Sequence, residues 1–146
     1  MKNIAYILLI FTLISCSNPQ HIKFLATREP SPLMFIDDLD TKLYIICSKY
    51  EALHLYDDLK GTLIQEIGIN NYYSSMQRRM SIISYTNDIG TCQFQSATYE
   101  WLSAKYGINT NVLDPEYSQI EVLVLAFLDN RQNLWYGYKK YKNSIE

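Results

Sequence analysis

Glu66 occupies a position from which a carboxyl group could act as a general acid. It ends a segment with helical, largely apolar character, residues 59–66, and directly precedes a Gly- and Asn-containing loop, residues 68–71. A carboxyl group at such a place is partly desolvated and can still face a cleft, and desolvation raises its pKa. Glu51 is a competing candidate for the same role.

The potential metal ligands are scattered along the chain. The two histidines and three cysteines are far apart, so the closely spaced ligand pairs of zinc sites are missing. The acidic residues are expected to form a solvated face and helix caps, because the spacing of a calcium loop is absent. We therefore predict no metal site and no cofactor. The acidic residues in question are Asp37, Asp38, Asp40, Asp57 and Asp58.

Two segments would carry Glu66 and the loop that follows it. Apolar residues recur at steps of three and four from Asp38 to Ile67, which predicts one or two helices with Asp38 or Asp40 as N-cap and a break within residues 57–61. Residues 68–88 combine turn chemistry with a short apolar patch, and we predict that they form mainly loop.

Three further helices are expected after this loop. Ser96 is a suitable N-cap for a helix over residues 97–106, and Gly107 is suited to its left-handed C-terminal position. Asp114 and Pro115 begin a helix that runs to about residue 129 and is apolar almost all round, so it should be central. Residues 134–141 form a last amphipathic segment.

Length and composition limit the architecture to one small domain. The chain has 146 residues, of which 48% are hydrophobic and 19% charged, as in a globular core. Thirteen tyrosines could serve helix packing or stacking on sugar rings, and composition alone does not decide between them. Together with the helical periodicity, these features predict a mainly α domain with one long loop.

Four pieces of sequence in a fixed order resemble the lysozyme-like lytic transglycosylases, in particular the short ones of conjugation and type IV secretion. In that family a helix ends in the catalytic Glu, a polar loop and a further helix follow, and Tyr-Gly-Ile and Leu-x-Asp-Pro motifs come next. The matching pieces here are Glu66, Ser84-Tyr85-Thr86-Asn87-Asp88-Ile89-Gly90-Thr91-Cys92-Gln93-Phe94, Tyr106-Gly107-Ile108 and Leu113-Asp114-Pro115. The similarity covers about residues 59–141 and implies an α+β lysozyme-like domain with a substrate groove.

The resemblance implies cleavage of the β-1,4 bond between N-acetylmuramic acid and N-acetylglucosamine in peptidoglycan. Glu66 would act first as acid and then as base, giving a 1,6-anhydromuramoyl product, and apolar neighbours such as Leu63, Ile64 and Ile67 would raise its pKa. No second carboxylate stands at an obvious partner position in the sequence, which argues against a two-carboxylate hydrolysis.

The resemblance also implies a set of substrate-binding residues. Gly90 would allow close approach of the glycan to the backbone, Gln93 would bind an acetamido group, and aromatic rings would stack on sugars. The aromatic candidates are Phe94, Tyr72, Tyr73, Trp135, Tyr138 and Tyr141.

The chain differs from the family directly after the acid. Ile67 stands where the family usually has Ser, which supports the acid. This difference motivates an alternative, a non-catalytic peptidoglycan-binding lipoprotein on the same fold. A small envelope lipoprotein that serves as an assembly module, without a cleft, is a third hypothesis.

The N-terminus indicates export and lipidation. Lys2 precedes an apolar run of eleven residues, 4–14, which is too short for the about 20 residues of a membrane span and fits a secretory signal. Leu13-Ile14-Ser15-Cys16 resembles a bacterial lipobox with Cys16 as the lipidated residue. We expect a signal peptide at 1–15, a lipidated tether at 16–36 and the domain at 37–146. Cys47 and Cys92 could then pair or remain buried thiols.

Charge and targeting together define the expected partners. The net charge of -2 provides no basic field for nucleic acid, so nucleic-acid binding is not expected. The expected partners are peptidoglycan strands, a lipid bilayer reached through acylated Cys16, and an envelope-spanning secretion or conjugation machine. The expected location is the cell envelope facing the periplasm, with the outer membrane favoured over the inner one.

Overall fold

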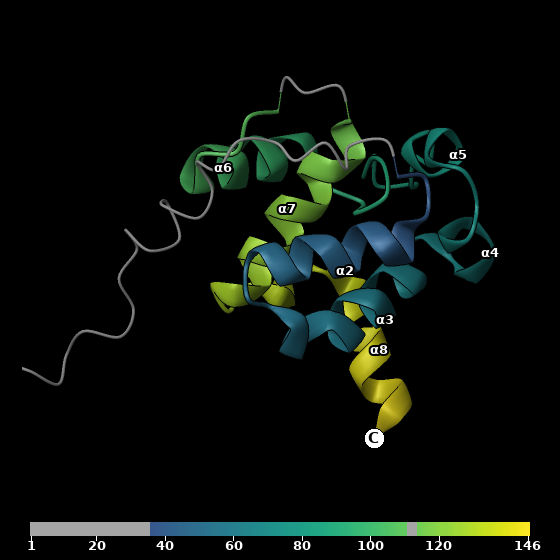
Figure 1. The fold of residues 1–146 in the computed structure, drawn as a ribbon. Helices are drawn as coiled ribbons and strands as arrows, with labels where there is room; N and C mark the ends of the chain where they lie inside the picture. Colours follow the sequence, from purple (N-terminus) through teal and green to yellow (C-terminus); the bar gives the residue numbers. More distant parts are fainter. Residues whose placement is uncertain (1–35, 111–113) are drawn as a thin grey trace, which may run out of the picture.

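The computed structural model describes residues 36–110 and 114–146, and within them the chain is all-helical (Figure 1). The described part contains isolated β-bridges that join Ile89 to Ile83 and Phe94, and no strand. The helical prediction is therefore confirmed, whereas the strand content of an α+β fold is absent from these residues. The helices are α2 (Leu39–Lys49), η2 (Leu53–Leu55), α3 (Tyr56–Ile67), α4 (Ile69–Tyr72), α5 (Met76–Met80), α6 (Ser96–Tyr106), α7 (Pro115–Leu128), η3 (Gln132–Leu134) and α8 (Tyr136–Ile145).

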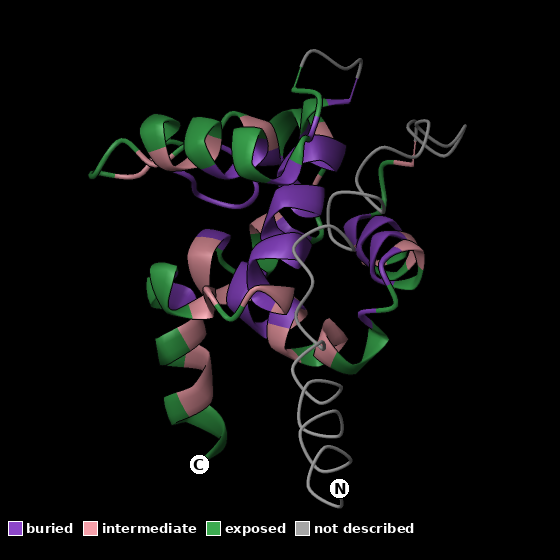
Figure 2. Ribbon diagram, turned by 90° about the vertical axis from the view of Figure 1, so that its left-hand side faces the viewer, coloured by how far each residue is buried: buried purple, intermediate pink, exposed green. Residues whose placement is uncertain are grey.

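Helix α7 is the centre of the molecule, as its apolar sequence predicts. All residues from Glu116 to Phe127 are buried, and Figure 2 shows the helix buried along its length between the other elements. Helices α2 and α6 pack directly against α7, while α3 packs against α2 and α8. Burial of apolar surface around one helix is the main term that stabilises a domain of this size.

The predicted helix boundaries depend on capping residues, and most of the predicted capping residues are confirmed. The side chain of Asp38 accepts a hydrogen bond from the Thr41 amide, and Asp114 does the same for the Tyr117 amide at the start of α7. Gly107 ends α6 in the left-handed conformation, with φ of 68°. The prediction for Ser96 was wrong, because it is the first helical residue and Gln95 precedes it without a side-chain cap.

Of two predictions about the segment 57–88, one was wrong and one is confirmed. Helix α3 runs through residues 57–61 without a break, and the chain turns earlier, at residues 50–55. Gly61 is a contact residue and no helix breaker, because a Cβ there would lie 2.4 Å from the ring of Tyr141 on α8. Residues 68–88 are mainly loop, as predicted, and contain the two short helices α4 and α5.

A buried ionic cluster holds the irregular segment 81–95 against α7. The Glu116 carboxylate, which is 0% exposed, accepts hydrogen bonds from Arg79, Lys42 and Thr91. Lys42 also pairs with Asp114. Burial alone would raise the pKa of Glu116, but its hydrogen bonds to Arg79, Lys42 and Thr91 lower it. The buried charges are therefore paired, as a fold with this interior requires.

The structure describes Cys47 and Cys92, whereas the predicted signal peptide and Cys16 lie outside the described residues. Cys47 and Cys92 are both buried and free, which decides between the two alternatives for this pair. Burial raises the pKa of the Cys47 thiol to about 12. Cys16, the signal peptide and nearly all of the tether lie outside the described residues. No helix within residues 36–110 and 114–146 has the length and apolar character needed to cross a bilayer.

Candidate active site

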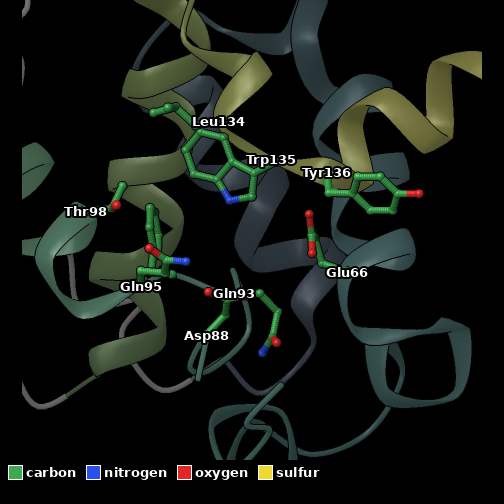
Figure 3. A pocket seen from close by; sticks show the side chains of 9 residues that line it. Glu66, Asp88, Gln93, Gln95, Thr98, Leu134, Trp135 and Tyr136 are labelled. Carbon is green, nitrogen blue, oxygen red and sulfur yellow. The ribbon is translucent and has the colours of Figure 1, made fainter. Parts of the chain in front are cut away.

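A cavity of about 300 Å³ lies where the end of α3, the segment 81–95 and the start of α8 meet. Glu66 faces it from α3, and the start of α8 borders it beside the carboxyl group (Figure 3). The side chain of Thr98, in the first turn of α6, also lines the cavity. The lining residues are Glu66, Asp88, Gln93, Phe94, Gln95, Thr98, Leu134, Trp135 and Tyr136.

The carboxyl group of Glu66 is half-buried at the edge of this cavity. Burial raises its pKa, as its position in the sequence predicts, and the negative charge of Asp88 raises it further. The backbone N–H of Gly137 donates a 2.6 Å hydrogen bond to Oε1, which favours the ionised form, as does the positive charge of Lys140. The pKa of this carboxyl group is therefore subject to influences of opposite sign.

Asp88 is a second carboxylate in the same cavity, which corrects the expectation that Glu66 has no acidic partner. Its Oδ2 accepts hydrogen bonds from the hydroxyl groups of Ser84 and Thr86, so the turn 84–88 fixes its position. The signal was present in the sequence, because Asp88 begins the Asp-Ile-Gly motif. Sequence separation from Glu66 concealed that the two carboxylates share one cavity.

Gly90 and Gln93, which were expected to contact the glycan, make hydrogen bonds and packing contacts within the protein. Gly90 has φ of 78°, and a Cβ there would lie 2.6 Å from the side-chain nitrogen of Gln119. The glycine thus admits Gln119 and is not among the residues that line the cavity. Gln93 does line it, but its side-chain nitrogen donates to the Gly90 carbonyl at 2.6 Å. This hydrogen bond fixes the orientation of the Gln93 amide toward the loop.

The aromatic residues that reach the cavity are Phe94, Trp135 and Tyr136. Trp135 is buried and packs edge-on against Phe94, with ring centroids 5.3 Å apart, while its Nε1 donates to the Cys92 carbonyl. These two residues form a fixed apolar wall. Tyr136 is 77% exposed and was missed by the sequence analysis, although it directly follows Trp135. Its ring is the available surface for stacking on a sugar.

Four predicted aromatic residues do not line this cavity. Tyr72 is fully buried and donates its hydroxyl hydrogen to Asp40, so no face is available to a sugar. Tyr73 lines a separate hollow beside α2 and α5. Tyr138 packs against Phe127, and Tyr141 covers Gly61.

The competing acid, Glu51, lies away from the cavity. It is exposed on the turn after α2, where it adopts φ of 56°. Because it lines none of the hollows described here, the structure brings only Glu66 of the two candidates together with the motif residues. Phe94 also borders an adjoining hollow of about 200 Å³, which is lined by Ile89, Phe94, Ser96, Tyr99, Glu100 and Gln119.

Comparisons with known proteins leave the site to be interpreted by its own chemistry. No family model matches the chain, and no match was found among the curated proteins or the solved structures. Within residues 36–110 and 114–146 no group of three His, Cys, Asp or Glu side chains is placed to hold a metal ion. The arrangement that remains is a carboxyl group of raised pKa beside a carboxylate, amides and aromatic rings.

Proposed function

We propose that this chain is a peptidoglycan lytic transglycosylase whose all-helical domain is lysozyme-like. The observation that carries the proposal is the half-buried Glu66, with its raised pKa, in a cavity shared with Asp88 and Gln93. The order of elements also supports the proposal, because Glu66 lies in the last turn of α3 and the motif loop leads into α6. The target would be the β-1,4 bond between N-acetylmuramic acid and N-acetylglucosamine.

In the first step the protonated Glu66 acts as a general acid. It donates its proton to the glycosidic oxygen, the bond from that oxygen to the anomeric carbon breaks, and the N-acetylglucosamine alcohol leaves. The acetamido oxygen of the muramoyl residue attacks the anomeric carbon and carries the positive charge. The raised pKa of Glu66 extends to higher pH the range in which the carboxyl group holds the required proton.

In the second step the ionised Glu66 acts as a base. It removes the proton of the muramoyl 6-hydroxyl, whose oxygen attacks the anomeric carbon and displaces the acetamido group. Glu66 recovers its proton, no water is consumed, and the product has a 1,6-anhydromuramoyl end. The backbone N–H of Gly137 stabilises the ionised form between the two steps.

Asp88 supports this scheme through its charge. A carboxylate in the same cavity stabilises the positive charge that develops at the anomeric carbon. It also raises the pKa of Glu66. If Asp88 instead activated a water molecule, the product would be a reducing end, so the identity of the product separates the two roles.

A second candidate function is non-catalytic binding of peptidoglycan. The observation in its favour is that Glu66 accepts the Gly137 amide at the start of α8, a contact that also occurs where a carboxylate only stabilises a helix N-terminus. In this case Glu66→Gln would retain glycan binding, and the wild type would release no products.

The proposed location follows from the N-terminal sequence. A signal peptide at 1–15 and acylation of Cys16 would tether the domain to the envelope, facing the periplasm, and acyl chains on one cysteine give stable anchoring. The proposed partners are the glycan strands, the bilayer and an envelope-spanning machine. Metabolic labelling with a fatty acid, compared between the wild type and Cys16→Ser, tests the anchor.

The function is tested by incubating the full chain, in detergent, with purified peptidoglycan and analysing the released muropeptides by mass. We expect anhydro ends, with release reduced at least about 100-fold in Glu66→Gln. Glu51→Gln is the matched control and should retain full activity. Anhydro ends that survive Glu66→Gln but vanish in Glu51→Gln would overturn the assignment of the acid. A folded wild type that releases nothing and pellets with the glycan would favour the binding function.

A further inference from the structure

The contact between α3 and α8 contains two glycines with different neighbours. A Cβ at Gly61 would lie 2.4 Å from the Tyr141 ring, whereas a Cβ at Gly137 would lie 2.8 Å from Cγ and Oε1 of Glu66. Both glycines lie inside helices, and neither has a positive φ. Each is therefore required by space rather than by backbone conformation. At Gly137 the side chain of Glu66, the proposed acid, occupies the position that a Cβ would need.

The same residue supplies the hydrogen bond that orients this acid. Gly137 is the second residue of α8, where backbone N–H groups have no partner within the helix. The preceding Trp135 makes no side-chain cap. The free N–H of Gly137 donates to Oε1 of Glu66 at 2.6 Å. No hydrogen bond from the rest of the described chain reaches Oε2.

We propose that Gly137 is a positioning residue for Glu66, whose backbone N–H holds Oε1 and leaves Oε2 to carry the transferred proton. This inference rests on the proposed function. Ile67, directly after the acid, is buried and has no hydroxyl group, so it makes no such contact. The support for the acid comes from 71 residues along the chain, through the packing of α8 on α3.

The amide of Gly137 provides a test that requires no change in α8. In the full chain, in detergent micelles, we expect the Gly137 amide resonances to shift with pH along the same curve as the Glu66 carboxyl carbon. Glu66→Gln should abolish this pH dependence. Three other titratable groups influence or face Glu66, namely Asp88, Lys140 and Cys92. A Gly137 amide that does not follow Glu66 in the wild type would overturn the proposal.

The substitution Gly137→Ala tests the positioning itself. The added Cβ displaces the carboxyl group from the N–H, and a displacement of about 1 Å costs on the order of 100-fold in rate. Loss of the hydrogen bond should also raise the pKa of Glu66 and move the pH profile of cleavage to higher pH. Gly61→Ala disturbs the same helix contact at Tyr141 and should lower the thermal midpoint without moving the pKa of Glu66.

The outcomes separate this inference from the proposed function. An unchanged or lowered pKa in Gly137→Ala, or an equal shift in Gly61→Ala, would overturn the positioning role even if the wild type cleaves glycan. If the pKa and amide titrations behave as expected but no peptidoglycan is cleaved, the hydrogen-bond geometry stands and the proposed function fails.

Discussion

The carboxyl group of Glu66 is subject to influences of opposite sign, and this balance determines how it behaves with pH. Burial and Asp88 raise its pKa, while the Gly137 amide and Lys140 lower it. The net direction is upward, so the folded state binds the proton more tightly than the unfolded chain does. Such a group holds its proton to higher pH than an ordinary glutamate does, and its ionisation costs stability.

The stability of Glu66→Gln should depend on pH in a way that differs from the wild type. Because the folded-state pKa is raised, the stability of the wild type falls as pH rises from the ordinary glutamate value of 4.5 through the raised value. Glutamine does not titrate. We therefore expect equal thermal midpoints below that window and a more stable Glu66→Gln above it. Glu51→Gln, at an exposed side chain, should change the midpoint little. A less stable Glu66→Gln above that window would indicate that Glu66 serves only to cap α8.

The second prediction concerns Asp88→Asn. Removing the negative charge lowers the pKa of Glu66, so the protonated fraction at a given pH falls and the alkaline limb of the pH-rate profile moves to lower pH. The asparagine side chain has nearly the same shape as the aspartate that it replaces in the 84–88 turn. Glu100→Gln, in the adjoining hollow, is the control and should leave the limb in place. An unmoved limb in Asp88→Asn would contradict the electrostatic coupling of the two carboxylates.

At the residue scale the sequence allowed part of the candidate site to be predicted. Glu66, Gln93, Phe94 and Trp135 were predicted and line the cavity. Asp88 was recognised as part of a motif but not as a partner of Glu66, because only the fold brings the two together. The exposure of Tyr136 beside the buried Trp135 could not be inferred either, since it depends on where α8 begins.

At the element scale, the buried cluster around Glu116 explains how a segment with no regular structure can build a site. Arg79, at the end of α5, and Thr91, beside Gly90, both donate to this one carboxylate on α7. Removing one partner of a buried ion pair leaves uncompensated charge and typically costs several kcal/mol, whereas exposed pairs contribute little.

This difference gives the third prediction. Glu116→Gln should lower the free energy of unfolding by about 3 kcal/mol, because Arg79 and Lys42 lose their common anion in the interior. Asp58→Asn breaks the partly exposed pair with Lys142 and should cost less than about 1 kcal/mol. Denaturant unfolding measures both. Equal losses in the two variants would contradict a stabilising role for the cluster.

Element boundaries were predictable where they depend on local chemistry. Asp38, Gly107 and Asp114 act within one turn of their own helix, so the pattern of residues was sufficient. The break predicted within residues 57–61 was wrong, and the role of Gly61 in this segment depends on Tyr141, which is distant in sequence. The short helices α4 and α5 were missed because turn residues such as Asn70 and Ser75 also begin or form short helices.

At the scale of the whole molecule, one central helix brings distant segments together around the cavity. Helix α7 is buried along almost its whole length (Figure 2). The cavity is lined by the end of α3, the segment 81–95 and the start of α8 (Figure 3). The mainly α class and the central place of α7 followed from the sequence. The cavity itself follows from tertiary packing, which residue patterns do not specify.

We propose that Glu66 cleaves peptidoglycan by intramolecular transglycosylation, and digestion in water enriched in heavy oxygen tests this proposal. Mass analysis of the new muramic acid ends then reports whether water or the 6-hydroxyl attacked. We predict anhydro ends without heavy oxygen, formed by the wild type and lost in Glu66→Gln. Reducing ends that carry heavy oxygen, or anhydro ends produced equally well by Glu66→Gln, would contradict the claim.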